Sequence, residues 1–179
     1  MLDRFKLDYY RYTGSYRISF LELMRDHSLR YLLCLRGGAL LKPLRKRLSI
    51  KYGLNLGSGE NIGPGLYLGH AYGINVNPRA SIGCNCSLHK GCTIGQENRG
   101  ERRGCPVLGN DVWVGINSAV VGNITIGDNV LIAPLTYVNC DVPSNSIVLG
   151  SPCRVIPCEN ATEGYSDNKI SFNGRANSN

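Results

Sequence analysis

Aliphatic residues recur at every sixth position through the middle of the chain, and many are followed directly by glycine. This spacing fits neither the 3.6-residue period of a helix nor the alternation of a long strand. It is typical of short strands joined by tight turns, where one inward aliphatic side chain per hexad fills a narrow prism. Corner sequences such as Gly109-Asn110-Asp111 and Gly127-Asp128-Asn129 suit these turns. The pattern predicts an all-β fold, a parallel β-helix with three hexads per coil, with inward residues Leu56, Ile62, Leu68, Ile74, Val76, Ile82, Leu88, Ile94, Leu108, Val114, Val120, Ile126, Ile132 and Val138.

Three segments interrupt or flank this repeat, which itself spans residues 54–156. Residues 1–53 form a short, basic helical arm, with one helix expected around residues 19–36 and a second short helix after it. Residues 96–106 are polar and cannot form a coil, so they should loop out. Residues 157–179 are polar and are predicted to be a mobile tail.

The net charge of +7 is unevenly distributed. Residues 1–53 hold 12 Lys and Arg against 4 Asp and Glu, whereas the remainder holds 8 against 9. The arm presents either a solvated face or a surface for an anionic partner such as a membrane, through Lys42, Arg45, Lys46, Arg47 and Lys51. No run of 18 apolar residues and no secretory signal are present, which predicts a cytoplasmic protein.

The eight cysteines are interpreted as reduced structural thiols, because Cys84, Cys86 and Cys92 fall inside the repeat. Cys84-x-Cys86 has no second ligand pair at zinc-finger spacing, so no metal site is expected. The basic arm has no aromatic stacking platform and no helix-turn-helix spacing, which argues against a nucleic-acid partner.

Of the three histidines, His70 is the strongest candidate for chemistry. It lies in a hexad of small residues that leave it accessible, and an imidazole can accept a proton from a hydroxyl near neutral pH. His89 is either an accessory residue of the same site or a surface residue. His27 lies in the arm, where a surface position is expected.

The motif His70-Ala71-Tyr72-Gly73-Ile74, the flanking hexads, the excursion at 96–106 and the ending at 150–156 resemble the left-handed β-helix hexapeptide acyltransferases. The branch most similar to this sequence is the serine O-acetyltransferase-like one, including enzymes of exopolysaccharide and capsule synthesis. The resemblance implies a left-handed coil, acetyl-CoA as co-substrate and a homotrimer with active sites between subunits.

The resemblance also implies roles for individual residues. His70 falls on the catalytic base, and Asn55 on the position of the acid that orients it. Acetyl-CoA is expected along a groove whose candidate residues are Gly95, Gly115, Ile116, Ala133, Pro134 and Arg154. The acceptor is expected near Gly69, His89, Arg103 and Cys105.

Several positions depart from serine acetyltransferases. Asn55 replaces the orienting acid, Gly69 replaces an acid that holds the serine amino group, and Gly104-Cys105 replaces an Arg-His pair that holds its carboxylate. A site without these partners should bind serine poorly, which favours a sugar hydroxyl of a surface polysaccharide or its precursor. Serine remains the alternative acceptor, and a catalytically inert scaffold is a further alternative. A carbonic-anhydrase-like metal enzyme is disfavoured because only two histidines lie in the repeat.

Overall fold

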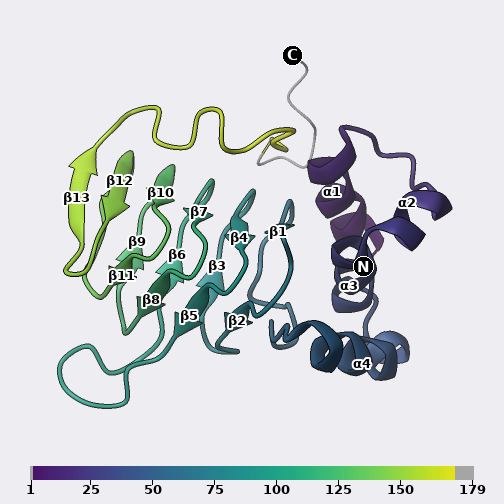
Figure 1. Cartoon of the computed structure of the whole chain (residues 1–179), viewed down its shortest axis with the longest axis horizontal. Helices are drawn as coiled ribbons and strands as arrows, with labels where there is room; N and C mark the ends of the chain where they lie inside the picture. Colours follow the sequence, from purple (N-terminus) through teal and green to yellow (C-terminus); the bar gives the residue numbers. More distant parts are fainter. Residues whose placement is uncertain (1, 172–179) are drawn as a thin grey trace.

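The computed structural model describes residues 2–171 and consists of a parallel β-helix preceded by a helical arm (Figure 1). Three sheets form the three faces of the prism. The first sheet contains β1 (Tyr67–Gly69), β4 (Ser87–His89), β7 (Trp113–Val114), β10 (Val130–Ile132), β12 (Ser146–Leu149) and the antiparallel β13 (Arg154–Pro157). The second contains β2 (Asn75–Val76), β5 (Thr93–Gly95), β8 (Ala119–Val121) and β11 (Tyr137–Val138). The third contains β3 (Ser81–Ile82), β6 (Val107–Leu108) and β9 (Thr125–Ile126).

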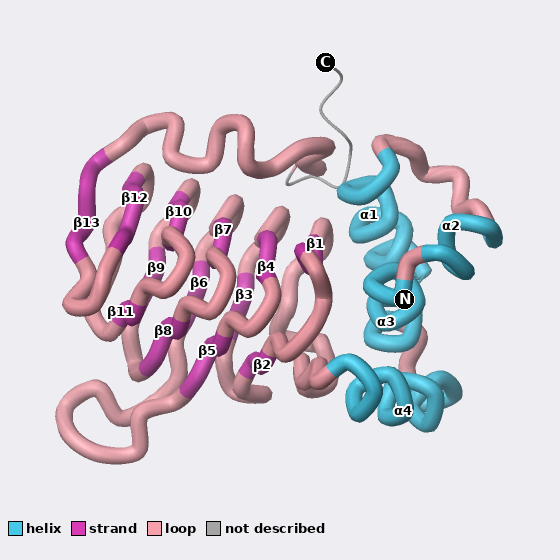
Figure 2. The backbone as a smooth tube through the Cα atoms, in the orientation of Figure 1, coloured by secondary structure: helices cyan, strands magenta, loops and turns pink. Residues whose placement is uncertain are grey.

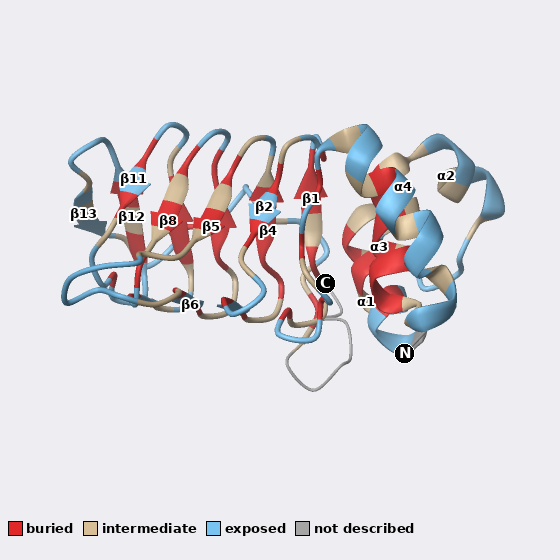
Figure 3. Cartoon of the chain, turned by 90° about the horizontal axis from the view of Figure 1, so that it is seen from below, coloured by how far each residue is buried: buried red, intermediate tan, exposed pale blue. Residues whose placement is uncertain are grey.

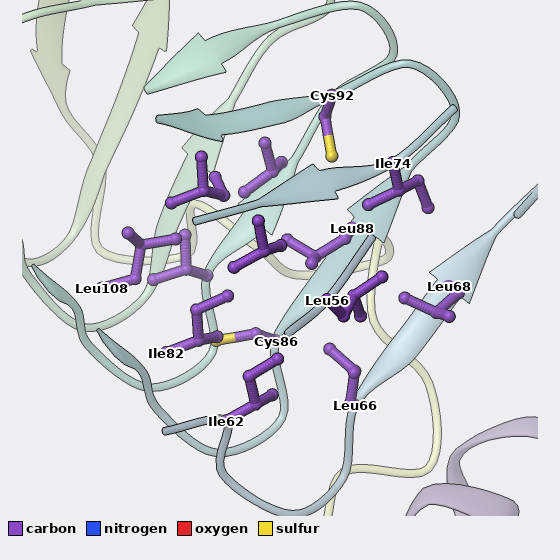
Figure 4. Close-up of a cluster of buried hydrophobic side chains, with 14 of the residues drawn as sticks. Leu56, Ile62, Leu66, Leu68, Ile74, Ile82, Cys86, Leu88, Cys92 and Leu108 are labelled. Carbon is purple, nitrogen blue, oxygen red and sulfur yellow. The ribbon is translucent and has the colours of Figure 1, made fainter. Parts of the chain in front are cut away.

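The inward aliphatic positions predicted from the six-residue period form the core of the prism. Leu68, Leu88, Val114, Ile132 and Val148 follow one another in register through the first sheet, and each is at most 1% exposed. Figure 4 shows this packing between neighbouring coils, where each layer of aliphatic side chains rests on the next. The stack removes apolar surface from water in every coil, which stabilises a fold made of very short strands.

Successive coils do not all have the same length. Asn75 pairs with Thr93 and Trp113 with Leu131, so these coils have the predicted 18 residues. Leu68 pairs with Leu88, which is two residues longer, and the extra pair lies in the corner that contains His70. The irregularity in the sequence repeat is therefore a local enlargement of one corner.

The core cysteines are buried as expected. Cys86 and Cys92 have no exposed surface and lie among the aliphatic layers (Figure 4). Burial raises the pKa of each thiol to about 12. Both remain protonated near neutral pH, so neither is suited to act as a nucleophile.

The arm contains more helices than the sequence pattern predicted: α1 (Leu2–Thr13), α2 (Phe20–Arg25), α3 (His27–Arg36), the 3₁₀ turn η1 (Ala39–Leu41) and α4 (Lys42–Tyr52). The single helix expected over residues 19–36 was wrong, because Asp26 divides it. Its backbone is extended, and its carboxylate accepts a hydrogen bond from the Ser28 amide at 2.7 Å, which caps α3. Among residues 2–171, no helix is long and apolar enough to cross a bilayer.

A buried ion pair fixes the arm to the first coil. Arg36 on α3 contacts Asp8 on α1 at 2.8 Å, and both side chains are almost fully buried. Arg36 also donates hydrogen bonds to the carbonyls of Gly59, Ile62 and Gly63, while Asp8 accepts one from the Leu66 amide. The arm thus covers the end of the prism, whose backbone would otherwise be an exposed edge.

The segment after β13 returns along the outside of the β-helix to α1, which is at odds with the mobile tail expected there (Figures 1 and 2). Ala161, Thr162 and Ile170 are buried. The polar groups of this segment bind corner residues that succeed one another along the stack of coils: Asn85 exchanges two hydrogen bonds with Ile170, Asp111 pairs with Lys169 at 3.4 Å, and Asn129 accepts one from Thr162 at 2.8 Å. Residues 172–179 of the expected tail lie outside the described residues.

Residues 96–106 leave the β-helix between β5 and β6 as a protruding loop (Figure 1). The backbones of Glu97 and Gly104 exchange two hydrogen bonds of 3.0 Å, which close the loop at its base. An exposed ion pair of 3.3 Å between Arg102 and Glu97 adds to this closure. The loop belongs to the corner between the second and third sheets.

Candidate active site

His70 occupies the enlarged corner between the first and second sheets. It follows β1 directly, its side chain is exposed, and its backbone has a φ of 49°. The Tyr72 amide donates to the His70 carbonyl at 2.7 Å, and the Gly73 amide donates to Tyr52 in α4. The two extra residues push the corner outward and present the imidazole to solvent.

The arm supports this corner through an aromatic cluster that the sequence did not reveal. Nε2 of His27 lies 3.1 Å from the Ala71 carbonyl, and its ring packs against Tyr52 and Tyr72 at 4.3 and 4.9 Å. His27 is half-buried, so its expected surface position was wrong. The contact joins residues 44 positions apart, and no local pattern could have indicated it.

Several predicted residues stack along this same edge of the prism. Gly69 pairs with His89 in the next strand, and Gly115 and Ala133 directly follow the paired residues Val114 and Ile132 in the strands beyond. Ile116 and Pro134 are the next residues of the latter two corners, as His70 is of the first. A Cβ added at Gly115 would lie 2.6 Å from the Pro134 nitrogen, so only glycine fits there. The edge therefore carries an imidazole at one end and small or apolar residues beyond it.

Three of the other predicted residues lie elsewhere, and Arg154 lies at the far end of the edge. Gly95 ends β5, and Arg103 and Cys105 belong to the 96–106 loop, which leaves a different corner. Arg154 begins β13 and pairs with Leu149 at the far end of the first sheet. Within one chain, the loop residues and His70 thus lie on two different edges of the prism.

Asn55 does not contact His70 in the way expected of an orienting residue. Its backbone pairs with the second sheet, donating to Ile74 and accepting from Val76, and the residue is exposed. Among the residues that the structure describes, no hydrogen bond joins its amide to the His70 imidazole.

His89 lies half-buried directly beside the candidate base. Its ring packs on Trp113 at 4.4 Å, and a side chain at Gly69 would overlap its Nδ1. Its Nε2 is buried without a hydrogen-bond partner in the described chain. Burial, with a smaller contribution from the nearby His70, lowers the pKa of His89 to about 4. A neutral imidazole therefore takes up the space next to Gly69 that an acidic side chain would need.

A cavity of about 230 Å³ adjoins His89. Three separate segments form its walls: α1 contributes Arg11 and Tyr12, the first sheet contributes Tyr67, Ser87 and His89, and the returning segment contributes residues 165–168. Arg11 holds these walls together by donating to the Gly65 carbonyl at 3.1 Å, to Oγ of Ser87 at 3.0 Å and to the Asp167 carbonyl. Sequence reasoning missed this cavity because its walls are far apart in the chain.

Comparison with known proteins identifies the type of repeat. Residues 105–140 match the family described as bacterial transferase hexapeptide (six repeats). The chain carries the hexapeptide repeat of bacterial transferases. A serine acetyltransferase of Synechococcus elongatus is 36% identical over 104 residues, which are 58% of this chain and 43% of that protein. A Helicobacter pylori serine acetyltransferase is 33% identical over 104 residues, 58% of this chain and 61% of the relative.

Solved structures agree with this assignment. The Neisseria gonorrhoeae serine acetyltransferase in complex with serine has a TM-score of 0.63 and 28% identity, covering 87% of this chain and 68% of that one. A serine acetyltransferase in complex with CoA has a TM-score of 0.69 at 20% identity, covering 86% and 67%, which shows a shared fold. The fold of this hexapeptide-repeat chain is thus a left-handed β-helix. The chain spans about half the length of the curated relatives it matches.

The lowered pKa of His89 predicts that the stability of the folded chain depends on pH. An unfolded histidine binds a proton near pH 6.5, whereas folded His89 does so only near pH 4. As the pH falls through this window, the unfolded state gains the proton first, so stability falls, by up to about 2 kcal/mol after allowance for partial exposure. The wild type should lose stability between pH 7 and pH 4.5, and we expect His89→Gln to lack this part of the loss. The urea midpoints of both proteins at the two pH values measure it. Parallel pH profiles of the two proteins would contradict the burial of a neutral imidazole.

Proposed function

We propose that this chain is an acetyl-CoA-dependent O-acetyltransferase in which His70 is the general base. His70 removes the proton of an acceptor hydroxyl, whose oxygen attacks the thioester carbonyl. A new C–O bond forms, the C–S bond breaks, and the CoA thiolate leaves with the proton that His70 returns. The observation that carries this proposal is the exposed imidazole at the enlarged corner, at one end of an edge of small and apolar residues.

Acetyl-CoA is proposed to lie along this edge. Gly115 and Ala133 have small side chains that leave room along the edge. Ile116 and Leu135, which are 36% and 72% exposed, offer apolar surface. Arg154 at the far end is suited to pair with CoA phosphates, because a guanidinium binds phosphate well. The two ends of the edge thus correspond to the two ends of acetyl-CoA: the His70 end to the reactive thioester, and the Arg154 end to the charged nucleotide.

A homotrimer is proposed to complete the site. Gly95 directly precedes the 96–106 loop and Arg103 and Cys105 belong to it, whereas His70 lies on another edge. Residues on different edges of one prism can face each other only when the edges belong to neighbouring copies. A closed trimer would form three such sites in which one copy supplies the base and the next supplies the loop.

L-serine is the acceptor that the comparisons support better, in place of the polysaccharide sugar favoured by the sequence. Several relatives are serine acetyltransferases, and one similar structure contains serine. Serine carries the primary hydroxyl that the proposed chemistry needs. The absent acidic and basic partners then require that other groups of this site hold its ammonium and carboxylate.

A sugar hydroxyl is a second candidate acceptor, favoured by one specific observation. His89 is neutral and fills the space beside Gly69, so an acid that would pair with an amino group cannot be accommodated there. The adjoining cavity of about 230 Å³ is lined by three tyrosines, His89 and two serines, together with Arg11, Asp167 and Asn168. These groups suit stacking and hydrogen bonding to a polyhydroxyl ring.

An acceptor panel tests the proposal. We expect the wild type to form O-acetylserine from acetyl-CoA. Mass spectrometry of the acetylated product is the measurement, since accessible cysteines such as Cys140 would react with thiol reagents. Acetylation of hexose glycosides but not of serine would select the second candidate. If calorimetry shows no acetyl-CoA binding, the transferase proposal fails and the scaffold hypothesis gains support.

A further inference from the structure

An apolar groove of about 430 Å³ lies between α2, α3 and α4 in the arm, and its lining includes Tyr52, which also packs against Tyr72 of the His70 corner. We call this the α2–α4 groove, and its apolar lining comprises Phe20, Leu23, Met24, Leu33, Cys34, Leu41, Leu44 and Leu48. Phe20 and Met24 on α2 are 78% and 57% exposed, and Leu44 on α4 is 48% exposed. Figure 3 shows the contrast between buried α3 and the exposed surfaces of α2 and α4. Apolar side chains this exposed on two neighbouring helices indicate an interaction surface.

Cations border this groove, and the part of the chain around the two from α4 has no acid. Arg30, Arg47 and Lys51 are part of its lining. From His27 to Gly59 the chain has no Asp or Glu. None of the five cations of α4 lies within ion-pair distance of an acid in residues 2–171. The groove thus combines exposed apolar groups with positive charge from α4 that pairs with no acid in residues 2–171.

The arm holds this surface rigidly with respect to the β-helix. The Asp8–Arg36 pair fixes α1 and α3 to the first coil, and α4 ends at Tyr52, which contacts the His70 corner through its carbonyl. Whatever binds the groove is therefore held in a fixed orientation to that corner.

We propose that the α2–α4 groove is a docking surface for a membrane that contains anionic lipids. The apolar residues insert at the boundary of headgroups and acyl chains, and the cations at the rim pair with lipid phosphates. A second copy of this chain is the less suitable occupant, because two like-charged rims would repel each other. The proposal does not depend on acetyl transfer.

Vesicle sedimentation tests this proposal with the full chain. We expect binding to vesicles of phosphatidylcholine with 30% phosphatidylglycerol and little binding to phosphatidylcholine alone. Binding to the anionic vesicles should weaken as the salt concentration rises, because salt screens the attraction between surface charges. Arg47→Gln with Lys51→Gln should weaken partitioning about 30-fold, because each cation contributes about fivefold. Phe20→Ser with Met24→Ser should weaken it about tenfold or more.

Matched variants outside the arm are the controls. Arg79→Gln with Arg99→Gln makes the same charge change, and Leu135→Ser removes an exposed apolar residue from a corner of the β-helix. We expect both to bind like the wild type. Equal binding of the groove and control variants, or no binding to anionic vesicles, would overturn the proposal. A larger mass in light scattering that the groove variants abolish, without vesicle binding, would assign the groove to a second copy instead.

Discussion

Replacing His70 by asparagine should reduce kcat for acetyl transfer about 100- to 10,000-fold, the range expected when a general base is lost. Asparagine is the variant of choice because His70 has a φ of 49°, and asparagine tolerates this left-handed conformation better than alanine does. Acetyl-CoA affinity should stay within a few-fold, since the proposed co-substrate groove runs beyond the base. Product formation by mass spectrometry and binding by calorimetry provide the two measurements.

Arg17→Gln is the control for this experiment, because it removes an exposed charged side chain in the arm. We expect near wild-type turnover from it. If His70→Asn kept wild-type turnover while its circular dichroism showed a folded chain, His70 could not be the base. The proposed function would then have to rest on another group, and neutral His89 would be the nearest to test.

Replacing Arg36 by methionine should lower the free energy of unfolding by about 3–5 kcal/mol. The change leaves the fully buried Asp8 carboxylate without its cation and removes the donors that bind the carbonyls of Gly59, Ile62 and Gly63. An unpaired buried charge is costly because water no longer solvates it. Urea unfolding followed by circular dichroism measures the loss.

Two further variants separate the ion pair from general effects. Arg102→Met breaks the exposed pair with Glu97 and should cost at most about 0.5 kcal/mol. Combining Asp8→Leu with Arg36→Met removes both charges and should recover a large part of the stability lost in Arg36→Met alone. A loss in Arg36→Met no greater than in Arg102→Met would show that the arm does not depend on this pair.

Local pattern was sufficient for the β-helix because each coil repeats one requirement. An inward aliphatic residue every six positions and a corner residue able to adopt positive φ are properties of single residues, so they are visible in the sequence. Even the two-residue irregularity between Ile74 and Val76 marked a real feature, the enlarged corner of His70. The break of the expected arm helix at Asp26 was not predicted. Asp26 can either continue a helix or end it by accepting the capping hydrogen bond from the Ser28 amide, and the surrounding tertiary structure decides between the two.

Several residues of the candidate site were expected from the family resemblance, and the repeat explains where they lie. His70, Gly115 and Ala133 lie on one edge because the repeat fixes their phase. The aligned corner residues Asn85, Asp111 and Asn129 were the one signal that a polar segment could bind along the stack, and the returning segment binds all three. The hydrogen bond of His27 to Ala71 and the steric relation of His89 to Gly69 left no such signal.

The sequence by itself thus determined the β-helix, its inward residues, the outward loop and the position of the candidate base, since these follow from periodic burial and turn chemistry within a few residues. The tertiary structure alone decided how α1 and the segment after β13 close over the first sheet, which groups surround His89, and where the arm exposes its groove. These features depend on contacts between residues tens to more than a hundred positions apart, such as Arg11 with Asp167. Such contacts depend on how the finished coils and helices pack, and no local period encodes them.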